Sequence, residues 1–355
     1  MSAVAAIATP LSRRQRGRQS AAGALPTLAV GAGSLAVFLV LVLWFTSVGA
    51  GEALSTFGRG AFGGVDPISE TLTRAVPLAI IGVGAGVALR AGVFNVGGES
   101  QMIAGAVAAT LVARWFGGAP AVAVWLLAVL AAVVGGAAWA VVPAVLWVRR
   151  GVSEILSTLL INFVTTALLA WVLAKTVLHD PDPTVITPQG RQLPAHLDLP
   201  LLIHGSRLHI GFLVAVVAVF ATAWTLRTAT GFRIDLVGAN PRLAAQAGVR
   251  PTRLRIEVLL ISAAFAGLAG AVQLFGLSHR LTTGLTGGVG YTGLLVAVLG
   301  RSKPLVTAVA AVVFAALLTG GEALERAGVP RTLSAVVQMV LIIGVALASV
   351  TEARR

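Results

Sequence analysis

The feature that most constrains this chain of 355 residues is a succession of apolar segments separated by short polar or glycine-rich stretches. Ten can be counted: residues 25–48, 75–89, 96–113, 121–148, 152–173, 208–226, 254–277, 291–299, 305–318 and 333–350. About 20 apolar residues suffice for an α-helix to cross a bilayer. Only 11% of the residues are charged, against about 25% in an average soluble domain. We therefore predict an all-α integral membrane protein, a single domain over residues 25–350 with about ten transmembrane helices.

Two of the ten segments, 75–89 and 291–299, are too short to cross a bilayer comfortably. Each adjoins a glycine-rich stretch, at residues 92–98 and 284–290 respectively. Non-helical backbone within a membrane is tolerated where it is covered by protein or lines a cavity. We therefore expect broken or re-entrant helices at these two places.

The net charge of +13 fits either nucleic-acid binding or the basic cytoplasmic loops of a membrane protein. If the basic tail 1–24 and the short tail 351–355 are both cytoplasmic, 17 of the 26 basic residues and 5 of the 13 acidic residues lie inside. Topology then accounts for the basic excess, and we expect no nucleic-acid partner. The first apolar run is longer than the roughly 7 to 15 residues of a signal-peptide core, so it is predicted to stay as a span.

Several kinds of chemistry are excluded by what the sequence lacks. There is no cysteine, so no disulfide, thiolate nucleophile or cysteine zinc site is possible. No phosphate-cradling loop, serine-hydrolase elbow or histidine pair at a helical zinc spacing occurs. We therefore expect no catalytic residue, no metal and no bound cofactor on this chain, which is not an enzyme.

The start of the third apolar segment carries Asn95, Glu99 and Gln101. Asn95 is expected to cap a helix whose first N–H groups would face the oxygens of a ligand. An ionisable residue such as Glu99 in a span is a candidate for function, because burying its charge is costly. Glu99 could instead pair with Arg90 or with a helix dipole, and the two interpretations stay open.

The fifth segment has a polar stripe. At about 100° per residue its polar side chains fall within an arc of roughly 140°. They are Glu154, Ser157, Thr158, Asn162 and Thr165. Such a stripe is either a solvated pathway or a set of hydrogen bonds between helices. We favour the pathway, and predict that these five residues line it together with Asn95, Glu99 and Gln101.

Two long polar loops complete the chain. Residues 175–207 form a proline-rich loop, predicted to be external, with three of the five histidines. Residues 227–253 form a basic loop, predicted to be cytoplasmic. After Pro241 the Ala-rich stretch 242–247 is expected to form a short helix, ended at Gly248.

The stretch 94–101 resembles the F-N-[IV]-G-x-E-G-Q signature of the permease subunits of ABC importers for nucleosides and simple sugars. Ser100 stands where glycine is usual. Four further stretches agree with this family in the same order: 151–162, 206–211, 231–249 and 290–304. The resemblance covers roughly residues 30–350.

The resemblance implies a set of partners in the plasma membrane. A second homologous permease would complete the pathway, P-loop ATP-binding subunits would carry ATP and Mg²⁺, and an external substrate-binding lipoprotein would deliver the ligand to loop 175–207. The segment that couples to the ATPase would comprise Gly238, Ala239, Asn240, Pro241, Arg242, Ala245 and Gly248.

The expected function is inward transport of nucleosides by alternating access. Alternatives are a permease for ribose-type sugars or branched-chain amino acids, or an ion-coupled secondary transporter that works alone. In that last case Glu99 and Glu154 would be the coupling sites.

Overall fold

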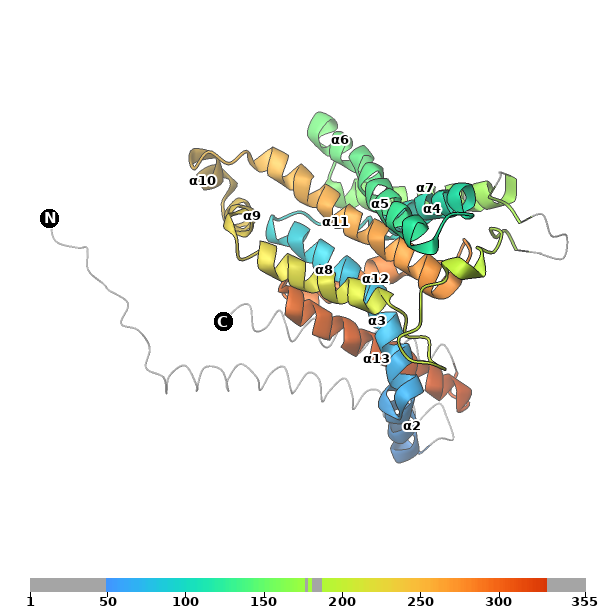
Figure 1. Ribbon diagram of the computed structural model, residues 1–355. Coiled ribbons are helices and arrows are strands. Elements are labelled where there is room, and N and C mark those ends of the chain that lie inside the picture. Colours follow the sequence, from blue (N-terminus) through green and yellow to red (C-terminus); the bar gives the residue numbers. More distant parts are fainter. Residues whose placement is uncertain (1–48, 176–177, 181–186, 331–355) are drawn as a thin grey trace, which may run out of the picture. The chain divides into compact units, whose positions relative to one another are not determined.

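A computed structural model describes residues 49–175, 178–180 and 187–330 (Figure 1). The apolar segments 25–48 and 333–350 and both predicted cytoplasmic tails lie outside these residues. The described elements are helices, joined in the loops by three isolated antiparallel bridges. The long helices are α2 (Ala50–Phe62), α3 (Val65–Arg90), α4 (Gly98–Phe116), α5 (Ala121–Trp139), α6 (Val141–Arg150), α7 (Glu154–Lys175), α8 (Gly211–Thr225), α9 (Ala229–Ala239), α11 (Pro251–Gln273), α12 (Val289–Leu299) and α13 (Pro304–Arg326). Three short elements are η1 (Ala195–Leu197), α10 (Pro241–Gln246) and the π-helical turn η2 (Leu274–Ser278).

The helices identify an all-helical protein with several membrane spans. Five stretches of the described chain are long and apolar enough to cross: Val65–Arg90, Ala121–Arg150, Glu154–Lys175, Pro251–Ser278 and Pro304–Arg326. Helices α8 and α9 would make a sixth span if counted together, but they are bent by 75°. Helix α12 is shorter, as predicted for its segment. The total of about ten stays a prediction.

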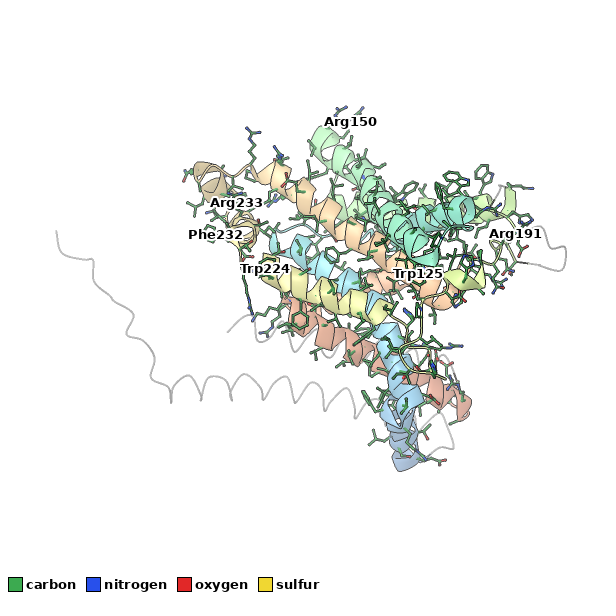
Figure 2. The ribbon with its side chains drawn as sticks, viewed as in Figure 1. Trp125, Arg150, Arg191, Trp224, Phe232 and Arg233 are labelled. Atoms are coloured by element: carbon green, nitrogen blue, oxygen red, sulfur yellow. The ribbon has the colours of Figure 1, made fainter. Side chains whose placement is uncertain are left out.

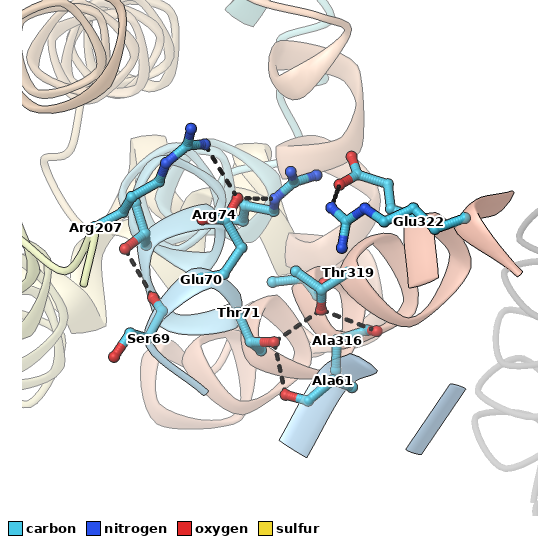
Figure 3. A network of polar contacts seen from close by, with 12 residues as sticks. Ala61, Ser69, Glu70, Thr71, Arg74, Arg207, Ala316, Thr319 and Glu322 are labelled. Atoms are coloured by element: carbon cyan, nitrogen blue, oxygen red, sulfur yellow. Dashed lines mark hydrogen bonds and ion pairs between the residues drawn. The ribbon is translucent and has the colours of Figure 1, made fainter. Parts of the chain in front are cut away.

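The expectation that segment 75–89 is too short to cross is wrong. Helix α3 has 26 residues, because it begins ten residues earlier in a polar stretch. The polar side chains there are hydrogen-bonded within the fold (Figure 3). Thr71 Oγ1 donates to the carbonyl of Ala61 at 2.9 Å and shares a hydrogen bond with Thr319 Oγ1 at 2.8 Å. Satisfied hydroxyls let a polar sequence continue a buried helix.

The chain forms two compact units, of which Gly58–Gly320 is the larger. The smaller unit includes the described residues 49–57 and 321–330. In the larger unit α11 packs against α3, α4 and α5. The contacts are made by small residues: a Cβ on Gly136 would lie 2.8 Å from the Cα of Gly267, and one on Gly105 would lie 2.5 Å from its carbonyl oxygen. The backbones of α4, α5 and α11 therefore touch, as is common in membrane helix bundles.

The basic loop 227–253 contains two helices where the sequence predicted one. Helix α10 confirms the short helix after Pro241, and α9 precedes it. Helix α9 contacts α3, and its buried residues are Gly231, Ile234 and Val237. Arg90 forms a two-pronged ion pair with Asp235 at 2.5 and 2.6 Å.

Candidate functional site

A break in the helical backbone separates α3 from α4 at residues 91–97. In its central part buried and exposed residues alternate: Val93, Asn95 and Gly97 are buried, whereas Phe94 is 45% exposed. Helix α4 begins at Gly98 with Gly97 as its N-cap, so the prediction that Asn95 caps the helix is wrong. The Oδ1 of Asn95 accepts from the Gly97 N–H at 3.0 Å and closes a turn before the helix starts.

From the end of α3, the break returns alongside α3 toward its middle. Helix α12 lies beside α3: Gly293 contacts Ile81, and Ser302, just after α12, contacts Gly86. Gly290 in turn contacts the backbone of Glu99, in the first turn of α4. Because Gly290 precedes Gly293 by about one helical turn, the start of α4 lies level with the middle of α3. At about 1.5 Å per residue, this point is about 18 Å before the end of α3. Helices α4 and α12 both begin about halfway along this span.

Glu99 holds the two half-helices together. Glu99 is only 7% exposed. It accepts from the N–H of Gly288 at 3.1 Å and from that of Gly290 at 2.8 Å. Both N–H groups belong to the N-terminal end of α12, where a negative charge is favoured by the helix dipole. The carboxylate of Glu99 thus accepts hydrogen bonds from the start of α12, and Arg90 pairs with Asp235 rather than with Glu99.

Two buried amides brace the same junction. Asn95 Nδ2 donates to Gln101 Oε1 at 2.8 Å, and Gln101 Nε2 donates back to Asn95 Oδ1 at 3.0 Å. Asn95 Nδ2 also donates to Ser262 Oγ of α11 at 3.0 Å. These contacts hold the break against the central helix α11.

The polar residues of α7 share one face of the helix, as their periodicity predicted, and that face contacts this junction. Four of its members are buried: Ser157, Thr158, Asn162 and Thr165. Asn162 Oδ1 accepts from the Ser100 N–H at 3.1 Å, and Asn162 Nδ2 donates to the carbonyl of Val96 at 2.9 Å and to Tyr291 Oη at 3.0 Å. One side chain therefore ties α7 to the break, to α4 and to α12.

Two threonines of the stripe also accept hydrogen bonds from other parts of the fold. Thr165 Oγ1 accepts from the indole N–H of Trp139 at 2.7 Å, and Thr158 Oγ1 accepts from the Val96 N–H at 3.3 Å. Glu154 is half-buried at the first position of α7, and its carboxylate has no partner among the described residues. The stripe thus makes hydrogen bonds between helices. That it also lines a substrate pathway stays a prediction.

Sequence reasoning missed two residues of this junction, Tyr291 and Ser262. Tyr291 is the chain's single tyrosine and follows Gly290 in one of the stretches that resemble the permease family, which is a signal that could have drawn attention to it. Ser262 is an isolated serine in an apolar helix, and no local pattern marks it.

The exposed side of the break cannot face lipid. The backbone N–H and C=O of Phe94 have no hydrogen-bond partner among the described residues. Hydrocarbon does not tolerate unpaired backbone groups, so this side faces water or another protein chain. Half-helices that meet at a polar junction inside a helical bundle are typical of membrane transporters. The fold and the site thus define a polytopic helical transport protein.

Comparison with protein families shows which kind of transport protein this chain is. Residues 67–346 match the family described as the branched-chain amino acid transport system permease component, and the chain belongs to that family. It is therefore a transport subunit of an ABC transporter rather than a catalytic one.

Three relatives are similar over most of their length. The glucose ABC transporter permease protein TsgB13 of Haloferax volcanii is 35% identical, over 78% of this chain and 75% of the relative. The guanosine ABC transporter permease protein NupP of Bacillus subtilis is 30% identical, over 91% and 92%. The nucleoside ABC transporter permease protein NupB of Lactococcus lactis is 29% identical, over 82% of each chain.

Proposed function

We propose that this chain is the permease of an ATP-driven importer that carries nucleosides into the cell. It would work in the plasma membrane with a second permease, P-loop ATP-binding subunits that carry ATP and Mg²⁺, and an external lipoprotein. The nucleoside assignment is supported by the guanosine relative, which aligns with 91% of this chain. The glucose relative makes simple sugars the second candidate. The proposal includes ten spans with both termini in the cytoplasm.

The junction of α4, α7 and α12 is the observation that carries this proposal. It is built from amides and hydroxyls, and the carboxylate of Glu99 already accepts hydrogen bonds from the N–H groups of Gly288 and Gly290. A site of this composition suits an uncharged, hydroxyl-rich ligand better than a charged one. The unpaired backbone of Phe94 supports a wet or protein-covered face beside it. The pathway would pass along this face and the polar stripe of α7.

Helix α10 is the segment that we assign to ATPase docking. Asn240 Oδ1 caps it by accepting from the N–H groups of Arg242 and Leu243, both at 3.1 Å. Gly248 follows it with φ +81°, a conformation that favours glycine. Leu243 is 49% exposed on this helix although it is apolar, which suits a partner's groove.

Motion of α10 has a direct route to the break. Helix α9 precedes α10, and a Cβ on its Gly238 would overlap the carbonyl of Arg90 and lie 3.3 Å from the Cα of Ala91. The Arg90–Asp235 ion pair joins the same two elements. Because Ala91 begins the break, a displacement of the α9–α10 pair would act on the backbone that leads to the junction, as alternating access requires.

The test is ATP-driven uptake of labelled guanosine by the complete importer in proteoliposomes. Leu243→Glu should lose most uptake and ATPase stimulation while inserting normally, because it places a charge on the docking face. Thr252→Glu, at an exposed position outside α10, is the matched control and should keep uptake. Normal uptake by Leu243→Glu would show that α10 does not couple.

Competition distinguishes the substrates. Excess unlabelled guanosine should block uptake, whereas glucose, ribose and leucine should not. Competition by glucose alone would assign the chain to sugar import. Uptake under an ion gradient without ATP would instead identify a secondary transporter.

A further inference from the structure

A basic cavity of about 390 Å³ lies between α9, the turn after α10, and the start of α11. Arg233 of α9 forms one wall, and Arg250 and Arg253 form the other, next to Glu257. Neither the pathway nor the docking of α10 uses these side chains.

The cavity has uncompensated positive charge. Arg253 is paired with Glu257 at 2.8 Å. The guanidinium groups of Arg233 and Arg250 have no hydrogen-bond or ion-pair partner among the described residues. The N-terminal end of α11, which starts at Pro251, adds the positive end of a helix dipole. An anion in this cavity would relieve the repulsion between the arginines.

Both walls reach the depth of lipid headgroups if the span Pro251–Ser278 crosses the bilayer from end to end. Helix α9 is bent by 75° from α8 and advances only about 4 Å along the α8 axis, so its whole length stays near one level. The span Pro251–Ser278 has 28 residues, about 42 Å, which is as long as the hydrocarbon core and both headgroup layers together. Arg250 and Arg253, at its first end, therefore lie among the headgroups.

Two exposed aromatic side chains lie close in sequence to Arg233. Trp224 in the last turn of α8 is 74% exposed, and Phe232, next to Arg233, is 67% exposed (Figure 2). Aromatic residues gather at the boundary between acyl chains and headgroups. A ligand that reaches both the arginines and this boundary has an anionic head and an apolar tail.

We propose that the cavity binds the phosphate-bearing headgroup of an anionic phospholipid of the inner leaflet. The bound headgroup bridges Arg233 and Arg250, and so fixes α9 against the start of α11 behind α10. Transport by the complete importer therefore depends on anionic lipid.

The test uses the complete transporter in nanodiscs of phosphatidylcholine, with or without phosphatidylglycerol. Native mass spectrometry measures the phosphatidylglycerol that stays bound to this chain. The double variant Arg233→Gln/Arg250→Gln should weaken its retention roughly thirtyfold, because two basic residues are removed from an anionic headgroup. Arg149→Gln/Arg150→Gln, which removes the same charge from the end of α6 outside the cavity, should retain it like wild type.

Three results would overturn the proposal. Equal retention by wild type and the Arg233/Arg250 variant would exclude the lipid site. In proteoliposomes, inorganic phosphate that replaces phosphatidylglycerol in supporting uptake would identify a free-anion site. Loss of the ATP-binding subunit from the variant, with lipid retention unchanged, would identify a protein-docking surface. Lipid retention is measured whatever the chain transports, so an error in the substrate assignment would not affect it.

Discussion

At the scale of single residues, Glu99 is the side chain with the most specific role. Glu99→Ala would leave the N–H groups of Gly288 and Gly290 unpaired in a buried place, at a cost of about 1–3 kcal/mol each. We expect a lower thermal unfolding midpoint in detergent and reduced uptake. Glu154→Ala is the control for stability, because the Glu154 carboxylate has no described partner. An equal fall of the unfolding midpoint in both variants would contradict the cap.

His209, just before α8, makes the loop around it sensitive to pH. Burial, and secondarily the nearby His279, lowers the pKa of His209 from 6.5 to about 4. Its Nδ1 accepts from the Gly211 N–H at 3.1 Å, which protonation would prevent. Because the unfolded loop takes up a proton near pH 6.5 and the folded loop only near pH 4, stability is present above pH 6.5 and falls as the pH drops toward 4.

Hydrogen exchange, corrected for intrinsic rates, measures this effect. Protection of the Leu202 and Ile210 amides, which donate to the carbonyls of Leu208 and Pro200, should fall between pH 6.5 and 4. His209→Phe should remove the dependence. If the dependence persists in that variant, His209 is not its source.

Sequence reasoning located the residues of the site better than their partners. Periodicity placed the α7 stripe on one buried face, because a helix has a fixed angular step. The partners of Glu99 are 189 and 191 residues away in the chain, and no local pattern encodes such a pairing. The prediction that Asn95 caps α4 was wrong because Asn95 closes a turn two residues before the N-cap. Sequence propensity alone does not distinguish these two roles of an asparagine.

At the scale of helices, the contact between α4 and α12 requires a glycine. A Cβ on Gly290 would overlap the backbone of Glu99, so Gly290→Ala must push the two helices apart. We expect a loss of about 1–3 kcal/mol in stability and a strong loss of uptake. Gly284→Ala is the control, since its Cβ would meet nothing within 4 Å. An unchanged Gly290→Ala protein would show that the half-helices do not meet this closely.

The breaks in α3–α4 and before α12 were predictable because glycine clusters interrupt apolar runs there. The length of α3 was not, since its first turns are polar and become helical only through contacts such as Thr71 with Thr319. Helix α9 was missed for a similar reason. Its mixed sequence is stabilised by packing on α3 and not by a regular apolar face.

At the scale of the whole molecule, the absence of cysteine makes the natural chain a ready background for mapping sidedness. Ala245→Cys on α10 and Gln192→Cys in the loop before α8 are exposed positions. In intact cells an impermeant maleimide should label Gln192→Cys but not Ala245→Cys, and permeabilisation should expose both. Labelling of Ala245→Cys from outside would show that the topology is the reverse of the proposed one.

The contact of α4, α5 and α11 through Gly105, Gly136 and Gly267 also predicts how the gene tolerates change. Where two backbones touch, even one added methyl group has no place to go, and a repacked neighbour cannot compensate because no side chain lies between the helices. A saturation mutagenesis survey should therefore find these three codons nearly invariant, while exposed apolar positions such as Leu126 and Leu130 accept almost any apolar residue.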